Sequence, residues 1–222
     1  MLAVYKLKDK KMKIKSVLTL LALFVTLASY AAPIVVVSDD FSSDSGVLGT
    51  INGWEESGPE TKNYNVSSSG VLEWNHTSGT SFDSTAVAFS SQSLVDLNDS
   101  ISVSFDYQTL STENNNTGFR IRLYQRGSDL FSTGAYGYAL NVPSGTSTAN
   151  ISYREIVNDP PFATGDNSAN AKSGAALGNG GSFIFTVTKT GASEITLSGS
   201  NSVRGAFSPD IRSTVITNFD SF

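Results

Sequence analysis

Two segments of this chain, 101–107 and 118–126, alternate apolar and polar residues almost without interruption. Successive side chains of a β-strand point to opposite faces, so this alternation predicts strands with one buried face. An amphipathic helix is excluded for both segments, because a helical face recurs about every 3.6 residues. The apolar positions are Ile101, Val103, Phe105 and Tyr107 in the first segment and Phe119, Ile121 and Leu123 in the second.

Other short segments rich in β-branched and aromatic residues are separated by Gly, Ser, Asn and Thr, and none has a helical repeat. Strands are expected at 34–41, 71–74, 85–89, 135–142, 150–157, 182–189 and 194–198. The polar, small-residue segment 159–181 is expected to be a long connection. Many short strands with almost no helix predict an all-β fold of two stacked antiparallel sheets, a β-sandwich of jelly-roll type.

The N-terminal segment has the features of an export signal. Lysines precede an apolar run at 17–27, and the small residues Ser29 and Ala31 suit cleavage by a signal peptidase. The run is shorter than the roughly 20 apolar residues that a membrane-spanning helix needs. Residues 1–31 are therefore predicted to be a signal peptide, with Met12 as an alternative start. The protein is expected to be secreted, extracellular or at the cell surface, without a membrane span once the signal is removed.

The remaining segment, 32–222, has the size of a single β-sandwich domain. It carries 9 basic and 19 acidic residues, a net charge of −10, which argues against nucleic acid as a partner. The chain has no cysteine, which excludes disulfides and thiolate zinc sites. Segment 217–222 resembles another strand, and this predicts that the domain is truncated at its C-terminus.

Four of the nine basic residues lie on two of the predicted strands. Arg120, Arg122 and Arg126 share one face of the segment 118–126 with Tyr124, and Arg154 lies in the segment 150–157. A guanidinium group binds carboxylate or sulfate through paired hydrogen bonds, and an aromatic ring can stack on a sugar. These five residues are candidates for binding an extracellular polysaccharide, in particular an anionic one.

The alternative for the arginines is a solvated sheet face, on which they pair across strands with carboxylates such as Asp106 and Glu155. Trp54 follows Gly53 in a loop-like setting and is a further candidate for stacking on a sugar. The alternative for Trp54 is burial, which is the usual role of a large aromatic side chain.

Three aspartates raise the possibility of a structural calcium ion. Asp39 and Asp40 lie in the first predicted strand and Asp220 in the last. Calcium takes oxygen ligands from several segments, and these carboxylates would meet if the two strands were neighbours. The alternative is that all three are solvated residues at strand ends.

Catalysis is disfavoured by what the sequence lacks. Glycosidases need two carboxylates beside the scissile bond, and the Glu-x-Asp-x-x-Glu run of sandwich glucanases is not in this sequence. The single histidine, His76, lies in a turn-like segment without a triad-like partner. We expect a non-catalytic protein that binds polysaccharide. The alternatives are a structural or adhesive surface protein without a glycan ligand, or a polysaccharide lyase or hydrolase.

The layout of these segments resembles secreted bacterial proteins with a concanavalin A-like (laminin-G-like) sandwich, of the kind associated with PEP-CTERM sorting tails. The resemblance implies a jelly-roll sandwich carried at a bacterial surface, and it implies no activity. The segments that carry it are 39–41, 53–54, 97–107, 118–124, 136–138, 152–155, 185–191 and 218–220.

Overall fold

The computed structural model describes residues 41, 46–47, 53–57, 64–74, 84–109, 119–143, 148–159, 166–174, 176–177, 179–213 and 216–222. All of these belong to one compact unit, Val36–Phe222. The predicted signal peptide, the strand expected at 34–40 and His76 lie outside the described residues. Within the described part of the chain no helix is long and apolar enough to cross a membrane.

The described residues form short antiparallel strands. They are β1 (Gly46–Val47), β2 (Trp54–Ser57), β3 (Tyr64–Val66), β4 (Leu72–Trp74), β5 (Ser84–Ser93), β6 (Ser100–Thr109), β7 (Phe119–Gln125), β8 (Ala135–Val142), β9 (Ile151–Asp159), β10 (Asp166–Lys172), β11 (Asn179–Gly191), β12 (Glu194–Asn201), β13 (Gly205–Ala206), β14 (Asp210–Arg212) and β15 (Asn218–Ser221).

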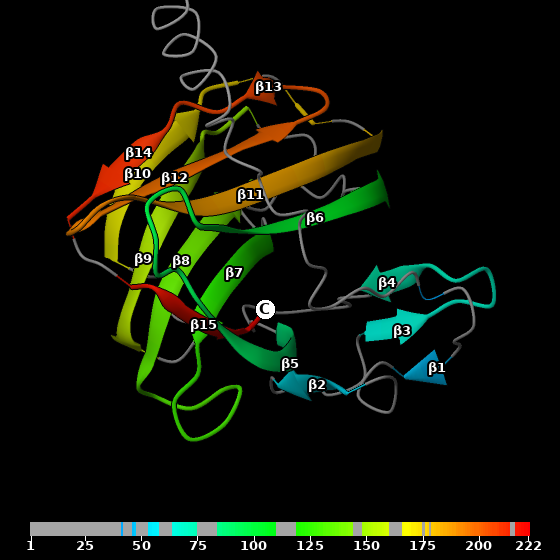
Figure 1. Ribbon diagram of the computed structural model, residues 1–222. Coiled ribbons are helices and arrows are strands. Elements are labelled where there is room, and N and C mark those ends of the chain that lie inside the picture. Colours follow the sequence, from blue (N-terminus) through cyan, green and yellow to red (C-terminus); the bar gives the residue numbers. More distant parts are fainter. Residues whose placement is uncertain are drawn as a thin grey trace, which may run out of the picture. The chain divides into compact units, whose positions relative to one another are not determined.

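The strands make three sheets. A seven-stranded sheet has the order β10-β9-β8-β7-β15-β5-β2, and a five-stranded sheet has the order β13-β12-β11-β6 with β14 also paired to β12. The two larger sheets lie one over the other (Figure 1). A small sheet, β1-β3-β4, completes the set. The prediction of an all-β fold with antiparallel sheets is confirmed, and the arrangement is compatible with a β-sandwich.

The core lies between the two large sheets, where the alternating sequences predicted it. Ile121 and Leu123 of β7 and Phe183, Phe185 and Val187 of β11 belong to one buried cluster. Aromatic rings join the sheets: Phe119 meets Phe183 edge to face with 5.6 Å between ring centroids, and Tyr153 stacks on Phe185 at 6.1 Å. Burial of this apolar face is the main force that holds the sheets together.

The prediction of one long connection at 159–181 is wrong. This segment contains β10 and the first residues of β11, and β10 pairs with β9 at the edge of the seven-stranded sheet. The pairing has two register shifts. Small polar residues carry little strand propensity, so here the neighbouring strand, and not the local sequence, determines the structure.

The strand-like end of the chain, in contrast, was correctly predicted. β15 is inserted between β7 and β5 in the interior of the seven-stranded sheet. Phe219 is fully buried in the core, and hydrogen bonds between the backbones of Phe222 and Val87 extend the ladder beyond β15.

Candidate binding face on the seven-stranded sheet

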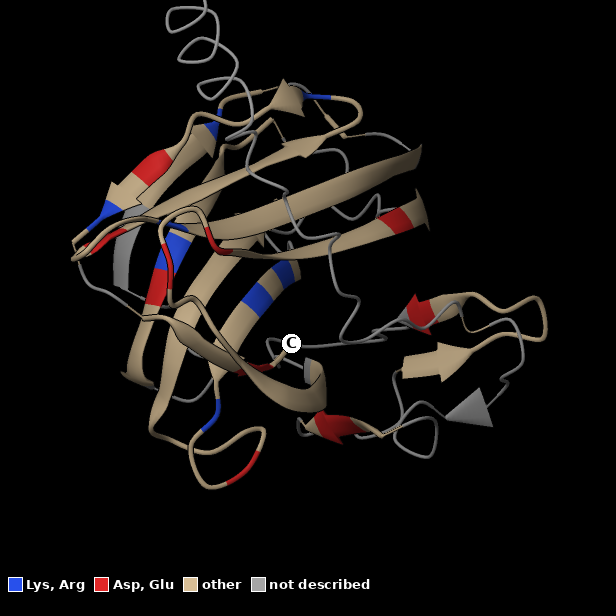
Figure 2. Ribbon diagram, viewed as in Figure 1, with Lys and Arg blue, Asp and Glu red and all other residues tan. Residues whose placement is uncertain are grey.

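Three of the candidate arginines lie on the outer face of the seven-stranded sheet. Ile121 and Leu123 point into the core. Arg120 and Arg122 occupy the alternate positions of β7 and therefore point to the opposite face. Arg154 of β9 lies on the same face, because it is in register with Ala139 and Ala139 is in register with Arg122. Blue segments on β7 and β9 mark these positions in Figure 2.

The strand register arranges this surface in two rows across β7, β8 and β9. One row is Arg120, Asn141 and Ser152, and the other is Arg122, Ala139 and Arg154. We call these six residues the arginine face. None of their side chains is acidic, and Ala139 separates Arg122 from Arg154 by two strand spacings, roughly 10 Å between backbones. The face therefore carries separated guanidinium groups with a small residue between them. Ala139 and Ser152 are buried, and the three arginines and Asn141 are half-buried.

The remaining described arginines have structural partners. Arg212 contacts the carboxylates of Asp210 and Glu155. Arg204 is buried and donates a hydrogen bond from Nη1 to the carbonyl oxygen of Ala149 at 3.0 Å. Arg126 forms an ion pair with Asp220, with 3.5 Å between Nε and Oδ2. The arginine face differs in that none of the six residues of its two rows is acidic.

Within the arginine face, the guanidinium groups of Arg122 and Arg154 are incompletely satisfied. Arg120 donates a hydrogen bond from Nε to Oδ1 of Asn141 at 2.7 Å. The Nε atoms of Arg122 and Arg154 are buried and have no hydrogen-bond partner within the described residues. A buried donor without an acceptor costs about 1–3 kcal/mol, so an anion that reached these atoms would bind with that cost removed.

The electrostatics of the face also favour an anion. Burial, and after it the charge of Arg120, lowers the pKa of Arg122 to about 10. Burial and the charge of Arg154 lower the pKa of Arg120 in the same way. A lowered arginine pKa means that the cationic form is disfavoured where it stands. A carboxylate or sulfate placed between these groups would stabilise the cationic form of each.

Neither of the two carboxylates named in the alternative lies on the arginine face. Asp106 belongs to β6 of the other sheet, and Glu155 is in register with Tyr138 and lies on the core side of β9. Glu155 is 1% exposed and contacts Arg212, with 3.8 Å between Oε2 and Nη1. The sequence separation of one residue between Arg154 and Glu155 places them on opposite faces of the sheet.

Tyr124 lies on the same side of β7 but is not available as a stacking platform. Its side chain is 1% exposed and packs with Ala135, Ala139 and Ile156. Its hydroxyl donates a hydrogen bond to the carbonyl oxygen of Leu130 at 2.9 Å. The expectation that Tyr124 contacts a sugar fails because its side chain is buried. The residue opposite it on β8 is Gly137, where the strands approach so closely that a Cβ atom would lie 2.6 Å from the Tyr124 backbone.

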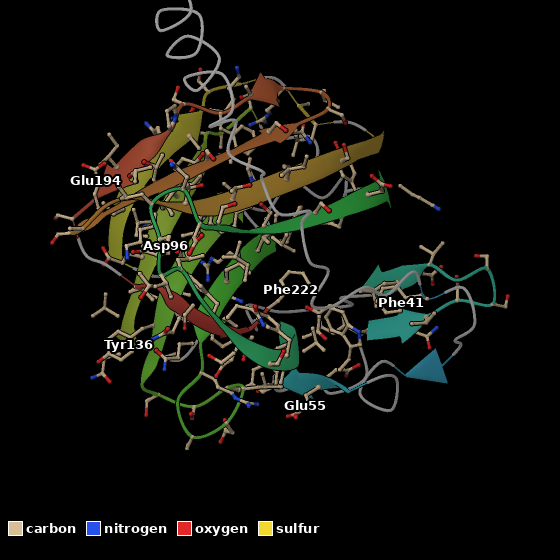
Figure 3. The ribbon with its side chains drawn as sticks, in the orientation of Figure 1. Phe41, Glu55, Asp96, Tyr136, Glu194 and Phe222 are labelled. Atoms are coloured by element: carbon tan, nitrogen blue, oxygen red, sulfur yellow. The ribbon has the colours of Figure 1, made fainter. Side chains whose placement is uncertain are left out.

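Trp54 lies in strand β2, not in a loop, and is 8% exposed. It packs with Val66 and Val87, and its ring meets Phe41 at 5.8 Å and Phe222 at 5.9 Å between centroids. Phe41 and Phe222 are labelled in Figure 3. The expected loop platform is therefore corrected to the burial alternative. This cluster packs the small sheet against the end of the seven-stranded sheet through Val66 of β3 and Val87 of β5.

The calcium candidates are only partly described. Asp220 accepts a hydrogen bond from the backbone N–H of Arg126 at 2.9 Å in addition to its ion pair with that side chain. Asp39 and Asp40 lie outside the described residues. The part of the chain that the structure describes contains no group of three acidic or histidine side chains that could hold a metal ion.

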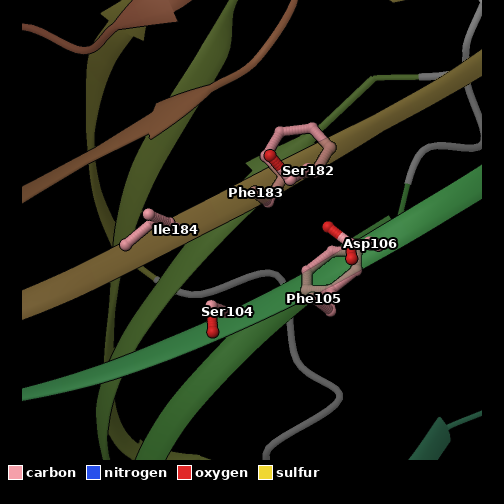
Figure 4. A pocket seen from close by; sticks show the side chains of 6 residues that line it. All are labelled: Ser104, Phe105, Asp106, Ser182, Phe183 and Ile184. Carbon is pink, nitrogen blue, oxygen red and sulfur yellow. The ribbon is translucent and has the colours of Figure 1, made fainter. Parts of the chain in front are cut away.

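The outer face of the five-stranded sheet differs in character. It is rich in hydroxyl groups, and Ser102 and Thr186 share a hydrogen bond at 2.8 Å. A shallow hollow over β6 and β11 is lined by Ser104, Phe105, Asp106, Ser182, Phe183 and Ile184 (Figure 4). Asp106 is the one ionisable group among these lining residues, so the hollow offers an anion no cationic partner.

No family model, curated protein or solved structure matches this chain.

Sequence reasoning identified the arginines but missed the residues that complete the face. Asn141 and Ala139 come from β8, and Ser152 precedes Arg154 on β9. A signal was present in the segment 137–141, where Gly, Ala and Asn alternate with Tyr and Leu. Small residues at alternate positions of a strand indicate that larger side chains from the neighbouring strands lie over it.

Three buried tyrosines make the fold sensitive to alkali. Burial raises the pKa of Tyr138 to about 12, and it raises the pKa values of Tyr124 and Tyr153 well above their usual range. The stability that these phenols contribute is complete below their unfolded pKa of about 10 and is lost as the pH rises above it. Arg122, with its lowered pKa, acts in the opposite direction but is a single group.

We therefore expect the free energy of unfolding to fall by roughly 3 kcal/mol per pH unit above about pH 10, the net effect of two protons at about 1.4 kcal/mol each. Urea titrations across this range, with tyrosinate absorbance followed in parallel, measure the slope. The hydroxyl of Tyr153 has no partner among the described residues, so Tyr153→Phe should keep the packing and reduce the slope by one proton. An unchanged slope in that variant would contradict the assignment.

Proposed function

We propose that this protein binds an anionic extracellular or cell-surface polysaccharide on its arginine face. The observation that carries the proposal is the pair of buried Nε atoms, on Arg122 and Arg154, that have no hydrogen-bond partner within the described residues. Guanidinium groups match the geometry of carboxylate and sulfate, the two anionic groups of polysaccharides. Asn141, which is half-buried beside Arg120, adds a neutral hydrogen-bonding group that suits sugar hydroxyls, whereas Ser152 is buried.

The wider proposal is a secreted, non-catalytic jelly-roll sandwich of concanavalin A-like type. The predicted export signal and a net charge of −10 for residues 32–222 support it from the sequence. The antiparallel sheets and their common core support it from the structure. The negative charge of the whole chain would repel an anionic polymer elsewhere on the surface, which confines binding to the arginine face.

The test is affinity electrophoresis of the purified protein in gels that contain alginate or ulvan, with laminarin and cellulose derivatives as neutral polymers. We expect the anionic polymers to retard the protein and the neutral ones to leave its mobility unchanged. Arg122→Gln and Arg154→Gln should each weaken binding by about tenfold or more, because each removes a charged group that would donate hydrogen bonds to the bound anion.

Arg126→Gln is the matched control, because Arg126 lies on the same side of the segment 118–126 but is already paired with Asp220. It removes the same charge from the chain and should leave retardation within about twofold of the unmodified protein. Unchanged mobility of the folded protein in every anionic gel would overturn the proposal. An equal loss in all three variants would indicate a general charge effect and not a site.

A further inference from the structure

The two large sheets end in edges that differ in how they are protected. Exposed edge strands invite pairing with other chains, and natural proteins block them with short strands, bulges or charges. At one end of the seven-stranded sheet β10 has two register shifts, and at the other β2 has four residues that include Glu55 and Glu56. In the five-stranded sheet, β13 and β14 have two and three residues.

β6 is protected neither by a short length nor by a bulge, and Asp106 is its one charged residue. It is ten residues long, contains no lysine or proline, and pairs with β11 in one continuous register. Among the described strands, β11 is its only neighbour in the sheet. Ten residues of regular backbone at an edge are a template for another strand.

The inner face of β6 is also incompletely covered. Val103 and Phe105 are only half-buried, whereas their cross-strand neighbours on β11, Phe185 and Phe183, are fully buried. On the outer face Ser102, Ser104 and Asp106 are exposed. A further strand beside β6 would cover the apolar pair and would meet only small polar side chains on the other face.

We infer that β6 pairs antiparallel with β6 of a second copy of this chain, about a two-fold axis at Ser104. In this register Val103 lies beside the partner's Phe105, and Ile101 lies beside the partner's Tyr107. Every apolar residue of the inner face then meets an apolar residue. The exposed face is also matched, because Asp106 lies beside the hydroxyl of the partner's Ser102 and the two aspartates are kept apart.

The sequence of β6 selects this register over its neighbours. Side chains stay on their own faces only if the axis passes through a residue, so the adjacent choices are axes at Val103 and Phe105. An axis at Val103 places Tyr107 opposite the partner's Asp99. An axis at Phe105 places Ile101 opposite the partner's Thr109. Two-fold pairing through one strand is an isologous contact, and it closes after two copies.

The test is the mass of the purified protein in solution, by sedimentation equilibrium, for the unmodified chain and two lysine variants. We expect a dimer. Ser104→Lys places two lysines directly opposite each other at the axis and should raise the dimer dissociation constant by tenfold or more. Ser102→Lys places a lysine beside the partner's Asp106 and should leave the dimer at least as tight.

Both substitutions lie at exposed positions of the same strand and add the same charge, so folding and net charge are matched between them. Urea unfolding of each variant confirms that the fold is kept. A monomeric unmodified protein, or a Ser104→Lys variant that associates as tightly as the unmodified chain, would overturn the inference. Dissociation by Ser102→Lys and not by Ser104→Lys would overturn the register.

Discussion

Replacing Phe183 with alanine is expected to lower the free energy of unfolding by about 3–5 kcal/mol, the range found for removal of a large aromatic side chain from a core. Phe183 is fully buried at the centre of the aromatic group that joins the two large sheets. Its ring centroid lies 5.5 Å from that of Phe105, 5.4 Å from that of Tyr107 and 5.6 Å from that of Phe119. All three contacts are lost together in the variant.

The size of the effect follows from where the cavity would form. β11 is central in the five-stranded sheet and pairs on both sides, with β6 and β12, so its backbone cannot move to fill the space. A cavity that does not collapse adds its own cost to the lost transfer free energy. Domains of this size are stabilised by only about 5–15 kcal/mol in total, so the variant should lose a large fraction of its stability.

Ile184→Thr is the matched control for Phe183→Ala. Ile184 is the next residue of β11, is 43% exposed and points to the opposite face of the sheet. Threonine keeps the β-branched shape, so the change should cost no more than about 1 kcal/mol. Urea denaturation followed by fluorescence measures both. Similar losses for the two variants would mean that the alternation of β11 does not separate core from solvent.

The alternating segments show how much of this fold could be predicted from sequence. Residues 101–107 and 118–126 place one face in the core as their pattern requires, because burial on one side of a sheet leaves a period of two in the sequence. β10 was missed because its residues are small and polar, and its strand exists through pairing with β9. An apolar–polar alternation in the sequence indicates which face of a strand is buried, but it does not indicate which segments pair at the edge of a sheet.

For the candidate site the limit is different. The alternation of β7 correctly placed Arg120, Arg122 and Tyr124 on one side of the strand, but it could not show what lies across from each of them. Register decides this: Arg122 faces Ala139, whereas Tyr124 faces Gly137 and is buried by its neighbours. Glu155 illustrates the same limit, because its partner Arg212 comes from a strand 57 positions later in the chain, in the other sheet.

That partnership is the basis of the second large effect that we expect. Arg212→Met should destabilise the protein by about 3–5 kcal/mol, because it removes the cation beside a carboxylate that is buried in the core-facing side of β9. The side chain of Glu155 is 2% exposed and that of Arg212 is 11% exposed. Asp210 also contacts Arg212 but is 21% exposed, so water can solvate its carboxylate when the arginine is removed.

A double-mutant cycle separates the ion pair from the side-chain packing. Glu155→Leu combined with Arg212→Met removes both buried charges, and a buried pair replaced by apolar residues of similar size is often neutral or stabilising. We therefore expect the double variant to be more stable than Arg212→Met alone. The exposed pair offers the comparison: Arg126→Met breaks the contact with Asp220, where Arg126 is 40% exposed, and should cost less than about 1 kcal/mol.

The outcome of this cycle bears on the arginine face as well as on stability. If Arg212→Met is costly and the double variant recovers, Glu155 is committed to the core side of β9, and its carboxylate is not available to neutralise Arg154 on the other side. If Arg212→Met costs no more than Arg126→Met, the carboxylate of Glu155 has access to water or to another cation.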